Sequence, residues 1–312
     1  MSSPLNPTLS TPTIGVFDSG FGGLTVLRAL IARVPQARFA FIGDTARLPY
    51  GSKSRRTIAR YAAESARFLV EEQGADYLVI ACNTASALAL DAIQNAVPSS
   101  VPVIGVIEPG AEAAQRASKT GDVLVIATDA TVQSHAYAAA CQARGLRALE
   151  KACPLLVPLV EEGWTTPDPF AFSGTEAHAA QAAAAPPQVA VTAEVFRIYF
   201  AELTAEAASL GLHPDTLVLG CTHYPLLKPL IQQAIPAGMQ AIDSAESAAD
   251  KLVSYLETAG YPSAPSAESV EFASPETAIR CFATDSVEKF ERLGPRFLGR
   301  PVGQVLLVDL GG

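Results

Sequence analysis

The sequence predicts an α/β fold with mainly parallel sheets. Short apolar runs alternate along the chain with longer segments of helical periodicity, which is typical of parallel strands joined by helices that cover both faces of a sheet. The alternation starts again near residue 122, so a second series of strands is expected. A chain of 312 residues is long enough for two domains of about 100–200 residues each.

The first half carries four predicted strands, each an apolar run that ends in polar or glycine residues. They lie at residues 13–17, 39–42, 77–81 and 101–106. The intervening helices are predicted at residues 24–32 and 54–73 and from residue 85 onward. This order of elements favours a sheet with helices on both faces.

The second half repeats the alternation less regularly. Strands are predicted at residues 122–127 and 216–219, with a shorter one at 146–149. Helices are predicted at residues 132–144 and 196–210.

Three stretches rich in Pro, Ser or Ala fall outside this pattern. Residues 1–13 are predicted to be a disordered tail, and residues 259–275 a long loop. Residues 164–192 contain few large aliphatic side chains and are predicted to be an insertion, partly helical or mobile.

The charge and hydropathy of the chain argue against several classes of protein. The net charge is -9 and the pI is about 5.0, and an acidic surface repels nucleic acid. No basic start with an apolar core marks a signal peptide, and no run of 18 apolar residues marks a membrane span. We therefore expect a cytoplasmic protein that binds neither nucleic acid nor a membrane.

Two of the five cysteines occupy equivalent places in the two halves. Cys82 follows the apolar run LVIA and Cys221 follows LVLG, and each precedes two polar residues. Ligands of open parallel sheets bind at the carboxyl ends of strands, where a helix N-terminus also favours a thiolate. Cys141, Cys153 and Cys281 lack this setting and are expected to pack as small apolar residues. The odd number and the absence of a C-x-x-C pair argue against a disulfide framework.

Polar residues follow other predicted strands as well. Asp18 and Ser19 lead into the segment GFGG, where a bare backbone allows close approach to a ligand, although Asp18 could equally cap the next helix. Pro49, Tyr50 and Gly51 form either an ordinary turn or part of a site. The chain has no G-x-G-x-x-G fingerprint and no Walker motif, so nucleotide binding is not supported.

Further polar candidates lie in the second half. Thr128 and Thr131 could hold a carboxylate or cap the helix that follows. Glu161 would ordinarily be a solvated acid. His223 lies two residues from Cys221, but a zinc site is not supported because no second ligand pair is close in the sequence.

Taken together, these segments resemble the glutamate racemases of the aspartate/glutamate racemase superfamily. The resemblance rests on GVFDSGFGGLTVL, FIGDTARLPYG, VIACNTASA, VIEPG, VIATDATVQSHAY, PLLVPLVEEG, LVLGCTHYPLL and FATDSVEKFERLGPRFLG. These segments follow one another from residue 15 to about residue 299, and the series is specific although each member is a weak signal. Residues 164–192 form a longer segment than the family usually has there.

The resemblance implies two pseudo-symmetric, doubly wound α/β domains with mainly parallel sheets and an active site in the cleft between them. The first domain is expected to comprise residues 14–106 and 243–312. The second is expected to comprise residues 107–242, with the insertion at about 164–192. Members of the family are often dimeric, which leaves a homodimer open.

The resemblance also implies interconversion of L- and D-glutamate without a cofactor or metal, to supply D-glutamate for peptidoglycan synthesis and hence cell shape. Cys82 would deprotonate D-glutamate and Cys221 would deprotonate L-glutamate. The implied catalytic set is Cys82, Cys221, Asp18, His223 and Glu161. The positions implied to hold the substrate or tune the thiols are Asp18, Ser19, Pro49, Tyr50, Gly51, Asn83, Thr84, Thr128, Thr131, Thr222 and His223.

Two alternatives remain open from the sequence. Aspartate racemisation, or another isomerisation on the same scaffold, would use the same paired thiols, and a comparison of both acids as substrates would separate them. A two-lobed amino-acid-binding protein would bind without catalysis, but such receptors usually carry a secretory signal and need no thiols at two strand ends.

Overall fold

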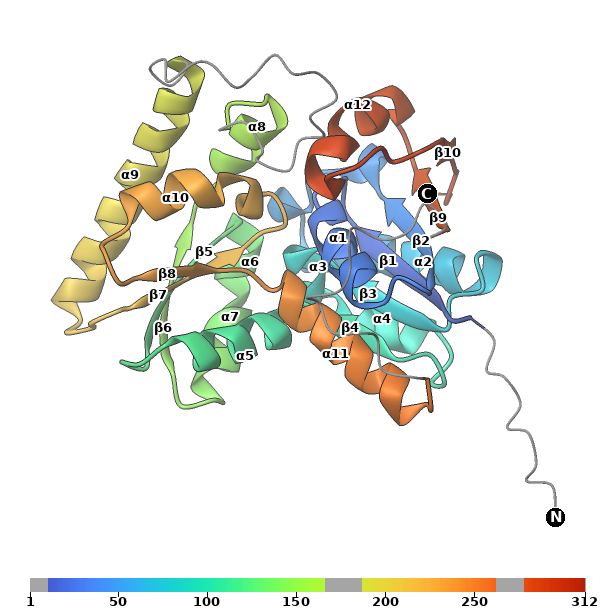
Figure 1. Ribbon diagram of the computed structural model, residues 1–312, viewed down its shortest axis with the longest axis horizontal. Helices are drawn as coiled ribbons and strands as arrows, with labels where there is room; N and C mark the ends of the chain where they lie inside the picture. The colour runs from blue at the N-terminus through green and yellow to red at the C-terminus, as the bar shows by residue number, and fades with distance from the viewer. Residues whose placement is uncertain (1–10, 166–186, 262–277, 312) are drawn as a thin grey trace.

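The computed structural model describes residues 11–165, 187–261 and 278–311, which form two α/β domains side by side (Figure 1). Each domain is built on one sheet, and every strand pair in both sheets is parallel. The predicted fold class is confirmed.

The six-stranded sheet of the first domain has the order β10-β9-β2-β1-β3-β4. Its strands are β1 (Thr13–Asp18), β2 (Arg38–Gly43), β3 (Tyr77–Ile80), β4 (Val103–Gly105), β9 (Ile279–Ala283) and β10 (Val305–Leu307). Ile14 and Val16 of β1 face one apolar core and Phe17 faces another, as the alternation of side chains along a strand requires.

The four-stranded sheet of the second domain has the order β6-β5-β7-β8. Its strands are β5 (Asp122–Ala127), β6 (Arg147–Ala152), β7 (Thr216–Gly220) and β8 (Gln240–Ile242). This order repeats β2-β1-β3-β4 of the first sheet, so β3 and β7 are equivalent strands. In both domains the order of strands reverses beside the first strand, and ligands of open α/β sheets bind at such a switch point.

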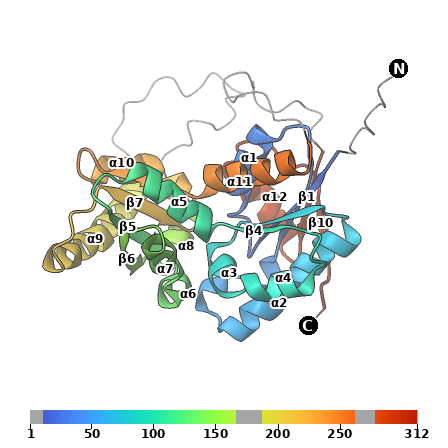
Figure 2. The same ribbon diagram turned by 90° about the horizontal axis from the view of Figure 1, so that it is seen from below.

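Helices cover both faces of the first sheet, with α1 and α11 on one side and α2 and α4 on the other (Figure 2). The helices of this domain are α1 (Leu24–Arg33), α2 (Arg55–Arg67), α3 (Asn83–Leu88), α4 (Leu90–Ala96), α11 (Ala245–Thr258) and α12 (Val287–Leu298). Short turns of other helical types are Thr45–Arg47, Tyr50–Ser52 and the π-helical Phe68–Glu72, which extends α2.

The second sheet is also covered on both faces. Its helices are α5 (Ile107–Ala117), α6 (Asp129–Ser134), α7 (Ala136–Gln142), α8 (Leu156–Glu161), α9 (Pro187–Ser209) and α10 (Lys228–Ala234), which a 3₁₀ turn at Tyr224–Leu227 precedes. Helices α5 and α7 pack against one face, and α8, α9 and α10 pack against the other.

The prediction of one helix over residues 132–144 is wrong, because the chain forms two helices, α6 and α7, in this region. His135 separates α6 from α7 in the left-handed conformation, with φ of 53°. The Ser134 hydroxyl donates to the carbonyl of Thr131 at 2.5 Å and accepts from the amide of Ala136 at 3.2 Å. These local bonds compete with the bonds of a continuous helix.

Other boundaries differ from the predictions. Helix α9 begins at Pro187, well before the predicted residue 196, so the last residues of the predicted insertion belong to a helix with Val189 and Thr192 buried. Strand β6 extends to Ala152, and Thr13, assigned to the predicted tail, is the first residue of β1. Residues 1–10 of that tail, residues 166–186 of the insertion and most of the loop at 259–275 lie outside the described residues.

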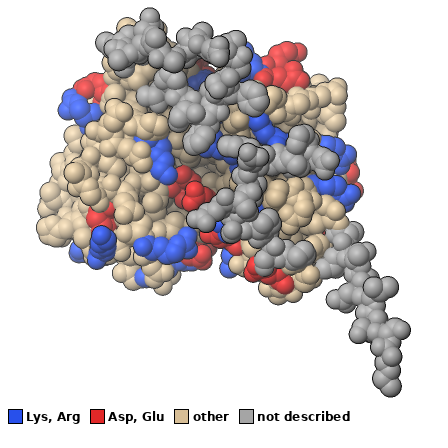
Figure 3. All heavy atoms as spheres, in the orientation of Figure 1, with Lys and Arg blue, Asp and Glu red and all other residues tan. Residues whose placement is uncertain are grey.

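The surface of the described residues carries mixed charge. Lys and Arg side chains are interspersed with Asp and Glu over the face in Figure 3. Within the described ranges, no helix combines the length and the apolar character needed to cross a bilayer.

A core substitution in α9 tests the packing of the longer helix. Phe196 is fully buried and stacks on Phe200 with ring centroids 5.6 Å apart, whereas Ile198 on the same helix is 47% exposed. We expect Phe196→Ala to lower the free energy of unfolding by about 3–5 kcal/mol through the cavity it leaves. The matched variant Ile198→Ala should change it by about 0.5 kcal/mol. Equilibrium denaturation followed by circular dichroism measures both, and equal effects would contradict the described packing of α9.

Candidate active site

Cys82 lies at the junction between β3 and α3, where it caps the helix. Its sulfur accepts a hydrogen bond from the amide of Ala85 at 3.5 Å and donates one to the Ser19 hydroxyl at 3.5 Å. The residue is 5% exposed. Burial, followed by the nearby charge of Asp18, raises the pKa of the Cys82 thiol to about 12.

Asp18 ends β1, the strand beside β3. Its Oδ2 accepts from the amide of Gly20 at 3.0 Å, while its Oδ1 is buried with no hydrogen-bond partner among the described residues. Burial raises the pKa of Asp18, and the charge of His223 and local amides oppose the shift only in part. A buried carboxylate oxygen without a partner is costly, so this atom is suited to meet a donor on a bound molecule.

Cys221 lies at the equivalent junction after β7 and is 7% exposed. Its Sγ lies 4.0 Å from Nδ1 of His223. Nε2 of His223 lies 3.3 Å from Oε1 of Glu161, at the end of α8. Lys289 Nζ donates to the other oxygen, Oε2, at 2.8 Å. Four side chains therefore form a chain from a surface cation to the sulfur.

The charges in this chain support one another. Burial alone would lower the pKa of His223, but its contacts with Cys221 and Glu161 outweigh burial and raise the pKa to about 10. Burial would raise the pKa of Glu161, but hydrogen bonds from His223 and Lys289 outweigh it and hold the pKa below its usual value. These contacts favour the imidazolium form of His223 at neutral pH.

Three threonine hydroxyls join the two domains at the starts of α3 and α6. Thr84 Oγ1, at the start of α3, lies 2.9 Å from Thr128 Oγ1 and 3.2 Å from Thr131 Oγ1. The last two hydroxyls lie 3.0 Å apart, and both belong to the β5–α6 junction. A cluster of three hydroxyls can donate several hydrogen bonds to one carboxylate.

Tyr50 and Asn83 each hydrogen-bond a buried side chain, and Gly51 packs against Thr128. Tyr50, which directly follows Pro49, donates a hydrogen bond from its hydroxyl to Asp44 Oδ2 at 2.5 Å. Gly51 approaches Thr128 so closely that a Cβ there would lie 3.0 Å from the threonine Cβ. Asn83 accepts from the Tyr137 hydroxyl at 2.7 Å.

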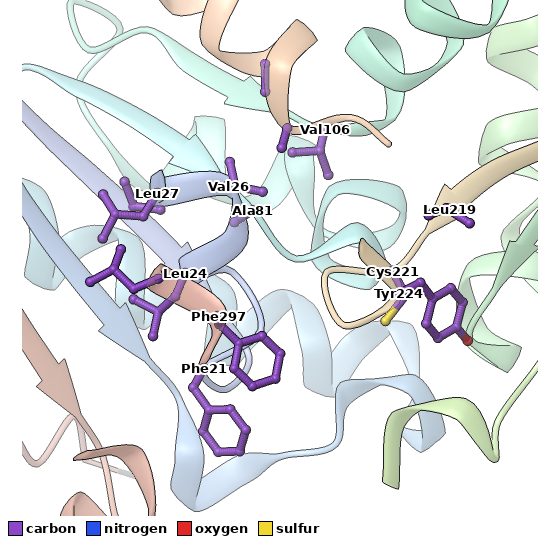
Figure 4. Close-up of a cluster of buried hydrophobic side chains, with 14 of the residues drawn as sticks. Phe21, Leu24, Val26, Leu27, Ala81, Val106, Leu219, Cys221, Tyr224 and Phe297 are labelled. Atoms are coloured by element: carbon purple, nitrogen blue, oxygen red, sulfur yellow. The ribbon is translucent and has the colours of Figure 1, made fainter. Parts of the chain in front are cut away.

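The start of α1, directly after the glycine-rich loop, also contacts the second domain. Thr25 Oγ1 donates to the carbonyl of Thr222 at 3.1 Å. Buried rings of Phe21 and Phe297 from the first domain lie near Cys221 and Tyr224 of the second (Figure 4). The His223 ring packs on Phe297 with centroids 5.2 Å apart. The two domains therefore meet through apolar rings as well as polar groups.

All the predicted site residues follow the carboxyl ends of strands. Asp18 and Cys82 end or follow β1 and β3, and the loop with Tyr50 follows β2. Thr128, Glu161 and Cys221 follow the equivalent β5, β6 and β7. Sequence reasoning missed Asp44, Tyr137 and Lys289, which contact site residues but carry no strong signal of their own. Within the described ranges, no cluster of three or more His, Cys, Asp or Glu side chains is placed to hold a metal ion.

Known proteins share this architecture along nearly the whole chain. Residues 14–252 match the Asp/Glu/Hydantoin racemase family. A glutamate racemase from Koribacter versatilis is 49% identical over 96% of this chain and 98% of its own length. A glutamate racemase isoform from Bacillus anthracis superposes with a TM-score of 0.77, at 34% identity over 96% of this chain and 98% of that structure. The glutamate racemase of Francisella tularensis, solved in complex with D-glutamate, gives a TM-score of 0.76, at 30% identity over 97% and 99% of the two chains.

Two parallel α/β domains with a thiol at equivalent strand ends, together with these similarities, define the class of two-domain racemases. The chain belongs to the Asp/Glu/Hydantoin racemase family. The resemblance inferred from the sequence segments is thereby confirmed.

Two glycines of one loop provide a test of the contact between the domains. A Cβ on Gly22 would lie 2.4 Å from Thr222 Oγ1 and 2.6 Å from His223 Nδ1, whereas a Cβ on Gly20 would meet nothing closer than 3.6 Å. Because Gly22→Ala must displace His223 from Cys221, we expect kcat for racemisation to fall by about 10²-fold. Gly20→Ala should stay near the parent rate. If both variants keep full activity with unchanged circular dichroism, the contact at Gly22 does not position the site.

Proposed function

We propose that this chain interconverts L- and D-glutamate by moving the α-proton between Cys82 and Cys221, without a cofactor. The observation that carries the proposal is the placement of the two thiols at equivalent strand ends of two facing domains. Inversion of a carbon requires a base on one face and an acid on the other. Two thiols in unlike protonation states supply both.

The reaction exchanges the states of the two sulfurs. Cys221, as thiolate, takes the α-proton of L-glutamate while the Cys82 thiol delivers its proton to the opposite face, which yields D-glutamate. The reverse reaction starts from the Cys82 thiolate. Because the two enantiomers have equal free energies, kcat/KM must be the same in both directions.

The neighbours of each sulfur would manage its proton. Asp18 and Ser19 lie beside Cys82, and the raised pKa of the buried Asp18 suits a group that exchanges a proton. His223 lies beside Cys221 and has Glu161 behind it. General acid–base catalysis supplies about 10²–10⁴-fold, so orientation and charge stabilisation must supply the rest.

The substrate would be held by the polar groups around the thiols. The hydroxyl cluster of Thr84, Thr128 and Thr131 suits one carboxylate, and the unpartnered Oδ1 of Asp18 suits the ammonium. The other positions assigned to substrate binding or to tuning the thiols are Ser19, Pro49, Tyr50, Gly51, Asn83, Thr222 and His223.

Glutamate is the proposed substrate because the relatives from Koribacter versatilis, Bacillus anthracis and Francisella tularensis, which match nearly the whole chain, are glutamate racemases. The same relationship is the basis for proposing that the D-glutamate serves peptidoglycan synthesis in the cytoplasm. A homodimer, which the family resemblance leaves open, is the assembly proposed for the chain.

Isotope exchange in heavy water tests the function directly. The purified protein, reduced and without added cofactor, is incubated with L-glutamate while optical rotation and α-deuterium are followed together. Loss of rotation with deuterium at the α-carbon is the expected result. If glutamate is inert and aspartate is racemised, the substrate assignment fails. If both are inert, the catalytic proposal fails.

Serine substitutions separate the two thiols. We expect Cys82→Ser and Cys221→Ser each to lower racemisation at least about 10³-fold in both directions, since every turnover uses both groups. Cys82→Ser should still exchange deuterium into L-glutamate with retained configuration, and Cys221→Ser into D-glutamate. Cys141→Ala, a buried cysteine of α7, is the control and should retain activity. Near-native racemisation by either serine variant would contradict the two-base reaction.

The pH dependence should follow the charge of His223. Its pKa of about 10 means that the imidazolium persists below that pH and is lost above it. We therefore expect kcat at saturating L-glutamate to fall as the pH rises through about 10. The substrate ammonium affects parent and variant alike, so comparison with His223→Asn isolates the contribution of the ring. Identical alkaline limbs in the two proteins would rule out His223 as the titrating group.

A further inference from the structure

Lys289 connects the two domains at the acid behind Cys221. It belongs to α12 of the first domain, whereas Glu161 ends α8 of the second. The ammonium donates to Glu161 Oε2 at 2.8 Å and also lies 5.4 Å from the centroid of the Phe21 ring. The two residues are 128 positions apart in the chain, so the ion pair exists only when both domains are folded and in contact.

The charged groups around this pair come from both domains. Glu161 faces Lys289 on one oxygen and His223 on the other. His223 in turn faces Cys221, the charge of Asp18, and the rings of Phe21 and Phe297. Arg296, also on α12, donates to Thr165 Oγ1 at 3.1 Å. Among the described residues, Lys289 is the cation whose ion pair with the Glu161 carboxylate lies on the oxygen that does not face His223.

We propose that Lys289 is a positioning residue, which holds the Glu161 carboxylate against His223 and so keeps His223 in its imidazolium form beside Cys221. This inference rests on the proposed function for its catalytic meaning. Its effect on His223 is a property of the folded protein and can be measured without turnover.

Glu161 is a half-buried carboxylate with two partners. Without Lys289, Glu161 would keep only the imidazolium, and burial would favour its protonated form more strongly. A neutral Glu161 no longer stabilises the charge on His223, so the ring would lose its proton at lower pH. The Lys289 side chain is 38% exposed, and solvent screens its charge, so a moderate effect is expected.

The experiment is a titration of ¹⁵N-histidine-labelled protein by NMR, together with the pH profile of kcat. The chain has only four histidines, and His223→Asn identifies the resonance of interest. The variants are Lys289→Met, which removes the charge, and Lys289→Arg, which retains it. The control is Lys151→Met, which breaks a comparable ion pair, 2.7 Å long, with Glu202 instead of Glu161.

We expect Lys289→Met to lower the titration midpoint of His223 by about one pH unit and to shift the alkaline limb of kcat by the same amount. Lys289→Arg should keep the midpoint and the alkaline limb close to those of the parent protein, and Lys151→Met should shift neither. An unchanged His223 midpoint in Lys289→Met would overturn the inference, as would an equal shift in Lys151→Met. A lowered midpoint with an unchanged rate profile would leave the effect on His223 intact and overturn the catalytic role assigned to that ring.

Discussion

The architecture depends on one constraint of parallel sheets, which is that every strand delivers its carboxyl end to the same edge. The chain uses the strand order 2-1-3-4 twice, so each domain presents such an edge, and the equivalent strands β3 and β7 each end in a cysteine. The edges meet where the hydroxyl of Thr84 approaches that of Thr128 and where Gly22 leaves room for Thr222. These two close approaches are among the contacts that hold the strand ends of the two domains together.

The two halves are alike in topology and unlike in charge. Cys82 has the buried acid Asp18 near it, with an oxygen that lacks a partner. Cys221 has an imidazolium beside it, and the acid of that half, Glu161, is one step further away. Identical surroundings would treat the two sulfurs alike, whereas the proposed reaction needs one protonated and one ionised sulfur. The repeated fold therefore supplies the placement, and the divergent side chains supply the difference.

The sequence predicted the strands that carry the site because apolar runs with polar ends are local signals, as at residues 13–17 and 122–127. It did not predict the break at His135, where the Ser134 hydroxyl bonds the local backbone and no proline or glycine marks the end of a helix. The sequence also did not predict contacts between segments that are far apart in the chain. Lys289 contacts Glu161, 128 residues away in the chain. The Tyr50 hydroxyl bonds the buried Asp44, which follows β2 in a segment whose sequence resembles an ordinary turn.

The return of the chain to the first sheet has a consequence for biosynthesis. Strands β9 and β10 join that sheet only after the whole second domain has been made, and β9 pairs with β2. Both thiols therefore leave the ribosome before Thr284, which bonds Asp44, and before Lys289, which bonds Glu161. A nascent chain that ends before residue 279 therefore carries both cysteines and His223, but it lacks the strand that pairs with β2 and the cation that contacts Glu161.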